Sequence, residues 1–325
     1  MTSISDASAQ YPVPDVRVPV EVAVVPVRHG VVPVGAIEAV AEAGGRCWVV
    51  GTGTDDALAA LGGAVTSAHL AELGPYAPAR WAAWLARRLP DDTTVVLPHS
   101  PDGRDLAPRL AAALDLPLVS SVVELAPGRA WVARHGGLAM DELELTGPVV
   151  ATLQIGIGRH PEPPLDAPAP RVERVAVDHD NGSEGHGADA ELVAELPADP
   201  ATMDLAEAPR IIAAGAGLGD RDQIAVLEAV AHALGASVGA TRLVTDYGWL
   251  PAERQIGTTG VMVQPELYLA VGVSGAVQHT AGLGHPAHVI AVNTDPSCPM
   301  MELADLALVC DAPAFLAELA RLLDI

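Results

Sequence analysis

The chain has 325 residues, of which 50% are hydrophobic and only 3% aromatic, and 41 acidic residues against 18 basic ones give a net charge of −23. This length suffices for two domains, and a core made mostly of Val, Leu, Ile and Ala favours α/β layers. The excess negative charge repels the phosphates of DNA and RNA, so we expect no nucleic-acid partner. Solubility is the simplest explanation of the acidic surface, although such a surface also attracts a basic partner.

Three cysteines, Cys47, Cys298 and Cys310, show no CxxC spacing, which argues against a zinc site, an iron–sulfur cluster or a disulfide framework. Cys47 and Cys310 fall in apolar runs, where we expect both thiols to be buried. The N-terminus lacks the basic and apolar regions of a signal peptide, and no run of 18 apolar residues occurs in the chain. These features predict a cytoplasmic protein that is not inserted in a membrane.

A first α/β domain is predicted over residues 21–177, after a loose, proline-containing N-terminus at residues 1–20. Apolar strands alternate with Ala- and Leu-rich helical stretches, which is the pattern of a largely parallel sheet. The predicted strands are 21–25, 46–50, 93–97, 118–125, 130–133, 149–153 and 171–177, and the predicted helices are 35–43, 55–61, 78–88 and 106–114.

Residues 158–209 interrupt this alternation. Closely spaced prolines between 161 and 170 are followed by an acidic, Gly-containing stretch from 178 to 189. Proline removes backbone donors and like charges resist compaction, so we predict an inter-domain linker over residues 178–208.

A second α/β domain is predicted over residues 209–325. Its first strand, 211–214, runs into the glycine-rich turn 215–219 and then into a helix at 223–234 with helical apolar spacing. Further strands are predicted at 267–273, 288–292 and 306–309, and an amphipathic helix at 315–323 ends the chain.

Polar and glycine residues gather at the ends of these later strands. Ser274 and Gly275 follow one strand, where Ser274 is expected to cap a helix that carries His279, and Thr241 and Arg242 follow another. The carboxyl ends of strands in an open α/β sheet are where nucleotide phosphates meet free N–H groups. The pattern therefore predicts a nucleotide-cofactor site in which His279 offers positive charge or an N–H donor.

Each of these features also has a plain structural explanation. The turn at 215–219 lacks the last glycine of a dinucleotide fingerprint, because Asp220 stands there, and it can be a tight turn only. Arg242 alone is typical of a surface arginine, and His279 alone of a structural histidine. No Ser-His-Asp, metal-binding or paired-carboxylate arrangement stands out, so such a site would bind a cofactor and leave the chemistry to it.

Several motifs follow one another in a fixed order over residues 239–311. They are Gly239–Arg242, Gly248–Pro251, Gln255–Gly257, Thr259–Gly260, Pro265–His279, Asn293–Pro296, Ala304–Asp305 and Asp311. With these motifs, residues 210–311 resemble the FAD-binding domain of the electron-transfer flavoprotein alpha subunit. A further motif, Gly103–Arg109, extends the resemblance to the first domain.

The resemblance implies a nucleotide-hydrolase-like N-terminal α/β domain and a Rossmann-like, parallel-sheet C-terminal domain that binds FAD. It implies an electron carrier rather than a substrate-converting enzyme, paired with an electron-transfer flavoprotein beta subunit. Such a carrier takes electrons from flavin dehydrogenases, including those of fatty acid beta-oxidation, and passes them to a quinone oxidoreductase.

The resemblance also implies the cofactor-binding residues. Arg242 would lie against the flavin ring, the Thr259 hydroxyl would reach flavin N5, and His279 would face the O2 edge. The full set is Thr241, Arg242, Gln255, Ile256, Gly257, Thr258, Thr259, Ser274, Gly275, Ala276, Gln278, His279, Asn293 and Asp311.

The chain departs from the family pattern at four positions. Ala216 replaces an arginine, Thr258 a glutamine, and Thr294 and Val261 each replace a lysine. The loss of cations predicts weaker FAD binding or a more negative flavin potential. The lysine-free, Ala-rich composition points to a divergent actinobacterial paralogue that serves mycofactocin-linked dehydrogenases.

Two other functions fit the same sheet type. One is a NAD-dependent oxidoreductase, which needs an acid/base residue that the sequence does not obviously supply. The other is a degenerate subunit that binds a nucleotide weakly and acts through its partner, which the departures at Ala216 and Thr294 would explain.

Overall fold

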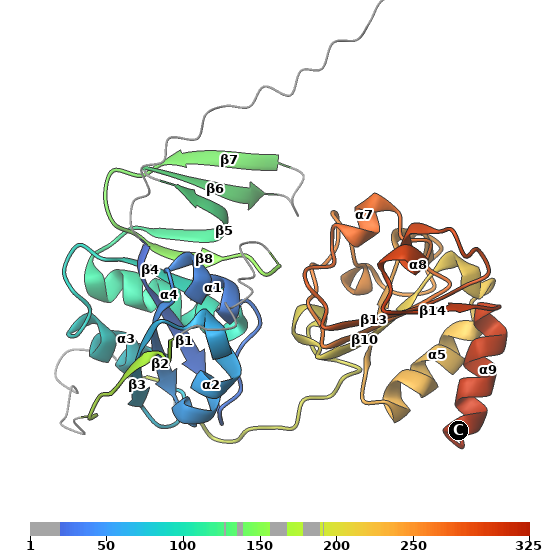
Figure 1. Ribbon diagram of the computed structural model, residues 1–325, viewed down its shortest axis with the longest axis horizontal. Helices are drawn as coiled ribbons and strands as arrows, with labels where there is room; N and C mark the ends of the chain where they lie inside the picture. Colours follow the sequence, from blue (N-terminus) through green and yellow to red (C-terminus); the bar gives the residue numbers. More distant parts are fainter. Residues whose placement is uncertain (1–19, 127, 135–138, 157–167, 178–188, 191) are drawn as a thin grey trace, which may run out of the picture.

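The computed structural model describes residues 20–126, 128–134, 139–156, 168–177, 189–190 and 192–325. The N-terminus predicted to be loose, apart from Val20, lies outside these ranges, as does most of the acidic stretch before residue 189. The expected α/β class is confirmed, and the described residues form two sheets, one in each half of the chain (Figure 1).

The N-terminal sheet has nine strands in the order β7-β6-β5-β8-β4-β1-β2-β3-β9. The strands from β5 to β9 in this order pair in parallel, whereas β6 and β7 are antiparallel at one edge. The strands are β1 (Val20–Val27), β2 (Arg46–Gly51), β3 (Ser67–Glu72), β4 (Thr94–Pro98), β5 (Leu118–Ala126), β6 (Arg129–Arg134), β7 (Ala139–Glu144), β8 (Val150–Leu153) and β9 (Arg171–Arg174).

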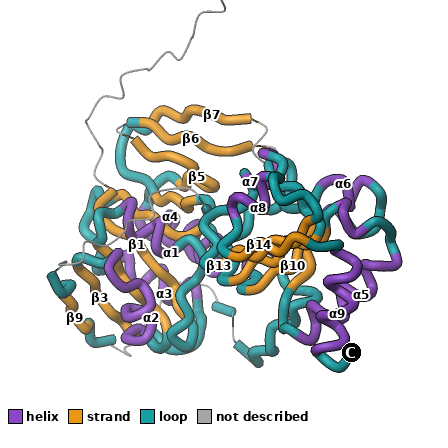
Figure 2. Tube along the Cα trace, turned by 45° about the vertical axis from the view of Figure 1, so that its right-hand side comes forward, coloured by secondary structure: helices purple, strands orange, loops and turns teal. Residues whose placement is uncertain are grey.

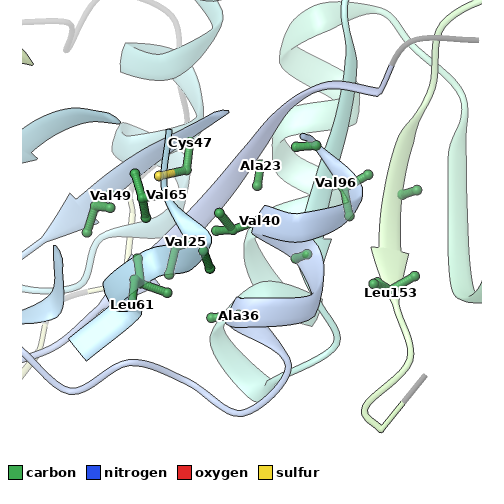
Figure 3. Close-up of a cluster of buried hydrophobic side chains, with 14 of the residues drawn as sticks. Ala23, Val25, Ala36, Val40, Cys47, Val49, Leu61, Val65, Val96 and Leu153 are labelled. Carbon is green, nitrogen blue, oxygen red and sulfur yellow. The ribbon is translucent and has the colours of Figure 1, made fainter. Parts of the chain in front are cut away.

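Helices cover both faces of this sheet, because successive residues of a strand point to opposite sides. Ala23 and Val25 of β1 pack with α1 (Ala36–Glu42) and α2 (Thr54–Leu61), in the cluster drawn in Figure 3. Val22 and Val24 pack instead with α3 (Pro78–Ala86) and α4 (Pro101–Leu114). A strand buried on both faces needs a continuous apolar run, which is what the sequence has there.

Two strands of this sheet were not predicted from the sequence. β3 reads Ser-Ala-His-Leu-Ala-Glu, and β7 reads Ala-Met-Asp-Glu-Leu-Glu, so neither carries the β-branched run that marks a strand. Both form because a neighbouring strand offers a ladder of backbone partners, β2 for the first and β6 for the second. The expected burial of Cys310 is also wrong, because this thiol is exposed while Cys47 and Cys298 are buried.

The C-terminal sheet has five parallel strands in the order β11-β10-β12-β13-β14. They are β10 (Arg210–Ala214), β11 (Ser237–Ala240), β12 (Leu267–Val271), β13 (His288–Asn293) and β14 (Leu306–Val309). The helices are α5 (Asp222–Ala233), α6 (Arg242–Asp246), α7 (Val277–Thr280), α8 (Pro299–Leu303) and α9 (Ala312–Leu322). Figure 2 shows α5 and α9 together on one side of this sheet and α7 and α8 on the other.

The order of the C-terminal strands reverses at β10, because the chain passes first to β11 on one side and then to β12 on the other. In open α/β sheets, ligands bind at the carboxyl ends of the strands beside such a reversal. The fold therefore directs attention to the turns after β10, β11 and β12. Among the described residues, no helix has the length and apolarity needed to cross a membrane.

Candidate functional site

The turns after β10 and β12 meet backbone to backbone. The N–H of Gly217 donates to the carbonyl of Gly272 across 3.0 Å. Gly272 has φ +67°, and a Cβ added to it would lie 2.8 Å from Gly217. Glycine at both positions lets the two turns touch, which brings two strand ends close enough to hold one ligand between them.

After β12, five consecutive backbone N–H groups have no acceptor among the residues that the structure describes. They are those of Ser274, Gly275, Ala276, Val277 and Gln278. The expected cap by Ser274 is wrong, because α7 begins at Val277 and Ala276 stands at its N-cap. Unpaired donors in a row attract an anion, and a pyrophosphate offers the acceptors that they lack.

Thr241 lies directly after β11 and holds a buried hydroxyl oxygen that has no hydrogen-bond partner among the described residues. An orphaned buried hydroxyl is costly, and a ligand hydroxyl or phosphate beside it would remove that cost. The next residue, Arg242, begins α6 and pairs with Asp246 at 3.3 Å, with 69% of its side chain exposed. Such an exposed pair is weak, so the guanidinium is free to turn toward a ligand.

The loop 255–259 is organised by side-chain hydrogen bonds. The Gln255 side-chain amide donates to the Thr259 hydroxyl oxygen across 2.8 Å. The Thr245 hydroxyl lies within hydrogen-bond distance of two acceptors, the Arg242 backbone carbonyl at 2.9 Å and the Gln255 side-chain oxygen Oε1 at 3.0 Å. Thr259 thus accepts from the protein and keeps its own O–H to donate outward. Thr245 was not among the predicted site residues, and its place one turn after Arg242 was the available signal.

This loop is tied to α7. The N–H of Thr258 donates to the carbonyl of Gln278 across 2.8 Å, and Gly257 with φ +141° would bring an added Cβ to 2.6 Å from the same oxygen. Ile256 is 1% exposed and anchors the loop in the core. The predicted residues from 255 to 259 and from 274 to 279 therefore lie together in the structure.

His279 is buried on α7 with both ring nitrogens engaged. Nδ1 lies 3.1 Å from the carbonyl oxygen of Ile256 and Nε2 lies 2.7 Å from the hydroxyl oxygen of Tyr268. A carbonyl only accepts, so Nδ1 carries the hydrogen and Nε2 of the neutral ring accepts from Tyr268. Burial lowers the pKa of His279. The surroundings thus favour a neutral ring over the positive charge, which was one of the two roles that the sequence suggested for His279.

Asn293 and Asp311 lie at the ends of β13 and β14, farther along the sheet. The Asn293 amide donates to the carbonyl of Val273 across 3.0 Å and so steadies the turn after β12. Asp311 accepts from the N–H of Ala314 across 3.1 Å as the N-cap of α9. Both side chains have structural tasks, and their contact with an adenosine remains a prediction.

A second polar cluster lies nearby, in a cavity of about 550 Å³ lined by residues from both halves of the chain, among them His99, Ser121, Thr258 and Met262. His99 Nδ1 lies 2.8 Å from the Thr152 hydroxyl oxygen, and Nε2 lies 3.2 Å from that of Ser121. Burial, with the nearby Arg104 charge, lowers the pKa of His99 to about 4. The His99 ring is therefore neutral at pH 7.

Two family models match the chain in succession. Residues 34–180 match the electron transfer flavoprotein domain, and residues 204–284 match the electron transfer flavoprotein FAD-binding domain. The second match covers the turns described above and ends before Asn293 and Asp311. FAD is therefore the cofactor for which this part of the chain is built, and the free N–H groups and the orphaned Thr241 hydroxyl fit it.

Several relatives found by sequence are electron transfer flavoprotein alpha subunits. The chain is 36% identical over 223 residues to the mitochondrial electron transfer flavoprotein subunit alpha of Oryza sativa subsp. indica, and the match covers 67% of this chain but only 62% of that relative's length. It is 34% identical over 231 residues to the subunit alpha of Mycobacterium leprae, with 67% of each covered.

A third relative is the subunit alpha of Pseudomonas aeruginosa, 33% identical over 228 residues, with 70% of this chain and 72% of the relative covered. The names of these relatives give no support to the expected link with mycofactocin. The matches to both family models and to these relatives agree with the two-sheet fold and with the strand-end site. The chain belongs to the electron transfer flavoprotein alpha subunit family, and its C-terminal part is that family's FAD-binding domain.

Proposed function

We propose that this chain is the alpha subunit of an electron-carrying flavoprotein. It holds FAD at the strand ends of the C-terminal sheet and pairs with an electron-transfer flavoprotein beta subunit. It takes electrons from flavin dehydrogenases and delivers them to a quinone oxidoreductase. The pairing with a beta subunit is what membership of the family implies. A role in beta-oxidation, an actinobacterial origin and a link with mycofactocin have no support in the family matches or in the relatives' names.

The observation that carries this proposal is the junction of the turns after β10 and β12. Gly217 and Gly272 are in contact there. Among the described residues, neither the five N–H groups after β12 nor the Thr241 hydroxyl has a hydrogen-bond partner. The N–H groups would hold the pyrophosphate, and Thr241 would bond its neighbouring oxygens. Arg242 and the outward O–H of Thr259 would lie at the ring. Bound FAD supplies the electron transfer, and these side chains position it.

The structure bears on the two alternatives. A hydride-transferring dehydrogenase needs an acid/base group at the cofactor, whereas His279 is neutral, buried and bonded at both nitrogens. A degenerate subunit would be expected to fill its nucleotide cradle with side chains, whereas the glycines and free donors are present here. Both observations favour a working FAD site.

The test is to co-express the chain with a beta subunit from the same organism and to record the visible spectrum of the purified complex. A flavin spectrum that bleaches on addition of a reduced flavin dehydrogenase supports the carrier. A colourless complex that responds to NADH would overturn it in favour of the dehydrogenase. A colourless complex that responds to neither would identify the degenerate subunit.

A further inference from the structure

A segment from the predicted linker lies over the strand ends of the N-terminal sheet. β1, β2 and β3 end side by side, and the turns that follow them line a cavity of about 270 Å³ with Arg28, His29, Thr52 and Tyr76. The cavity is closed on another side by Leu192 and Glu195. The order of the N-terminal strands reverses at β1, so this cleft has the position of a ligand site in an open α/β sheet.

Three side chains of the segment engage the domain at regular spacing. The Asp189 carboxylate accepts from the N–H groups of Ala79 and Arg80, at 3.3 and 2.9 Å, in the first turn of α3. Leu192 lines the cavity, and Glu195 Oε2 lies 2.7 Å from His29 Nε2. These residues lie at every third position of the sequence, and their side chains contact the domain as an acidic, an apolar and an acidic group.

The rest of the described segment turns away from the domain. Val193 is 92% exposed and Leu196 is 87% exposed, whereas Leu192 between the two acids is 39% exposed. The described residues of the segment are neither helix nor strand, so regular backbone bonding does not explain their course. The contacts of Asp189, Leu192 and Glu195 with the domain explain the course of these residues instead.

The receiving groups are suited to carboxylates. The N–H groups at the start of α3 are unpaired within the helix and carry the positive end of its dipole. Asp102 holds Arg28 through two hydrogen bonds, at 2.6 and 2.7 Å, which leaves His29 and the α3 donors for the segment. The chain as a whole has a net charge of −23 and repels acidic peptides, whereas His29 and the N–H donors of α3 in this cleft attract carboxylates.

We propose that the strand-end cleft of the N-terminal domain is a binding site for an extended acidic peptide, and that the linker of the same chain is its occupant through Asp189, Leu192 and Glu195. Asp189 takes the place of an anion at α3, Leu192 covers the cavity, and Glu195 binds His29. The segment thereby occupies the groups of the cleft that bind carboxylates, and the linker is fastened to the N-terminal domain.

This occupancy sets the length of the tether between the domains. On the far side, Ser237 donates to the carbonyl of Pro200 across 2.6 Å, and Arg254 donates to the carbonyls of Ala201 and Met203. Asp199 belongs to the turn that these contacts hold, since its carbonyl accepts from the N–H groups of residues 202 and 203. Residues 196–198 are then the span between the anchors, and a proline at position 197 stiffens it.

Release of the three contacts would add at least the seven residues 189–195 to this span, or roughly 23 Å of extended chain. In Figure 1 the yellow segment crosses between the two domains as a single piece of chain without helix or strand. The N-terminal cleft therefore governs how far the FAD-binding domain reaches from its neighbour.

The test removes the negative charge of both anchors in the full-length chain, as its complex with a beta subunit. In Asp189→Asn/Glu195→Gln, we expect a non-specific protease to cut within residues 189–199 at least tenfold faster than in the parent. The control Glu228→Gln/Asp324→Asn removes two acids from exposed positions elsewhere and should be cut at the parent rate. Equal rates for the two double variants, in samples with the same circular dichroism, would overturn the proposal.

A second measurement asks what the released cleft binds. A synthetic peptide of residues 188–197 should quench or shift the fluorescence of Trp81, which lines the cavity, in the released variant. It should bind the parent at least tenfold more weakly, because the groups that bind its two carboxylates are already occupied by Asp189 and Glu195. The same peptide carrying Asp189→Asn and Glu195→Gln should bind neither protein. Binding of a nucleotide but not of the peptide would show that the cleft is a nucleotide site and would overturn the assignment.

Discussion

The hydroxyl oxygen of Tyr268 lies 2.7 Å from Nε2 of His279, so a buried strand residue holds the ring that the family resemblance places at the flavin. Tyr268 is fully buried, and burial raises the pKa of its hydroxyl, which therefore keeps its hydrogen and donates it. The carbonyl of Ile256 takes the hydrogen of Nδ1 on the other side. Two uncharged partners and a dry environment thus select the neutral ring.

Replacing Tyr268 with Phe should destabilise the protein, because Nε2 of a buried ring loses its donor. We expect the free energy of unfolding in urea to fall by about 1–3 kcal/mol. The matched control is Tyr247→Phe, since Tyr247 is 59% exposed. If the two substitutions cost the same, the bond from Tyr268 does not hold His279.

Gln255 should act on FAD through Thr259. Gln255→Leu removes the amide that orients the Thr259 hydroxyl, and we expect the Kd of FAD in the complex to rise about three- to tenfold, as one lost hydrogen bond implies. Because the two residues act as one unit, Gln255→Leu/Thr259→Ala should bind FAD no more weakly than Thr259→Ala alone. Additive losses in this cycle would mean that Gln255 contacts the cofactor independently.

Gly272 should be required for its contact as well as for its backbone angle. In Gly272→Ala the new Cβ would lie 2.8 Å from Gly217, so we expect loss of FAD together with a cost above about 2 kcal/mol in unfolding. Gly248 has the same φ of +67° and no atom within 4 Å of an added Cβ. Gly248→Ala should therefore cost about 1–2 kcal/mol and leave FAD bound. Loss of FAD in both variants would show that backbone strain alone disables the site.

Restoring a cation at the turn after β10 should strengthen the site. Ala216 is exposed at the start of that turn, so Ala216→Arg can point a guanidinium at the cofactor phosphates without displacing core atoms. We expect the Kd of FAD, measured by flavin fluorescence, to fall about tenfold, in line with one charge-assisted bond. Ala225→Arg places the same charge on an exposed position of α5 and should leave the Kd unchanged. Equal tightening in both variants would point to net charge rather than to the turn.

Stability should fall on acidification through the range that His99 governs. The pKa of this ring is about 4 in the folded protein, against about 6.5 in an unfolded chain. Below pH 6.5 the unfolded chain therefore takes up a proton that the folded protein refuses, so stability is lost as the pH drops from 6.5 toward 4. One such proton contributes a slope of at most about 1.4 kcal/mol per pH unit. His279, whose pKa is also lowered, acts in the same direction.

The measurement is the free energy of unfolding in urea at pH values of about 7, 6 and 5, over which the unfolded chain takes up this proton and the folded protein does not. His99→Asn should flatten the dependence on pH, whereas His288→Asn, at an exposed position, should leave it as in the parent. A parent-like slope in His99→Asn would assign the acid sensitivity to other groups.

The sequence by itself determined the α/β class, most of the strands and the region of the FAD-binding domain. Strands such as Ile211–Ala214 are recognisable from local apolar runs, and glycine motifs such as Gly272–Gly275 mark where two backbone segments approach closely. These signals are local, because they depend on residues close together in the chain. For the same reason β3 and β7 were not predicted, since each is stabilised by backbone pairing with a neighbouring strand.

Only the tertiary structure decided the protonation of His279 and the course of the linker. The protonation of His279 is determined by its hydrogen bonds with Tyr268, on a strand, and with Ile256, in a loop. The prolines and acids predicted an inter-domain linker but no contact for it, and Asp189 accepts from the N–H of Arg80 in α3 across a sequence separation of 109 residues. Hydrogen bonds between residues so far apart leave no periodicity in the chain, so their partners become visible only when the fold brings them together.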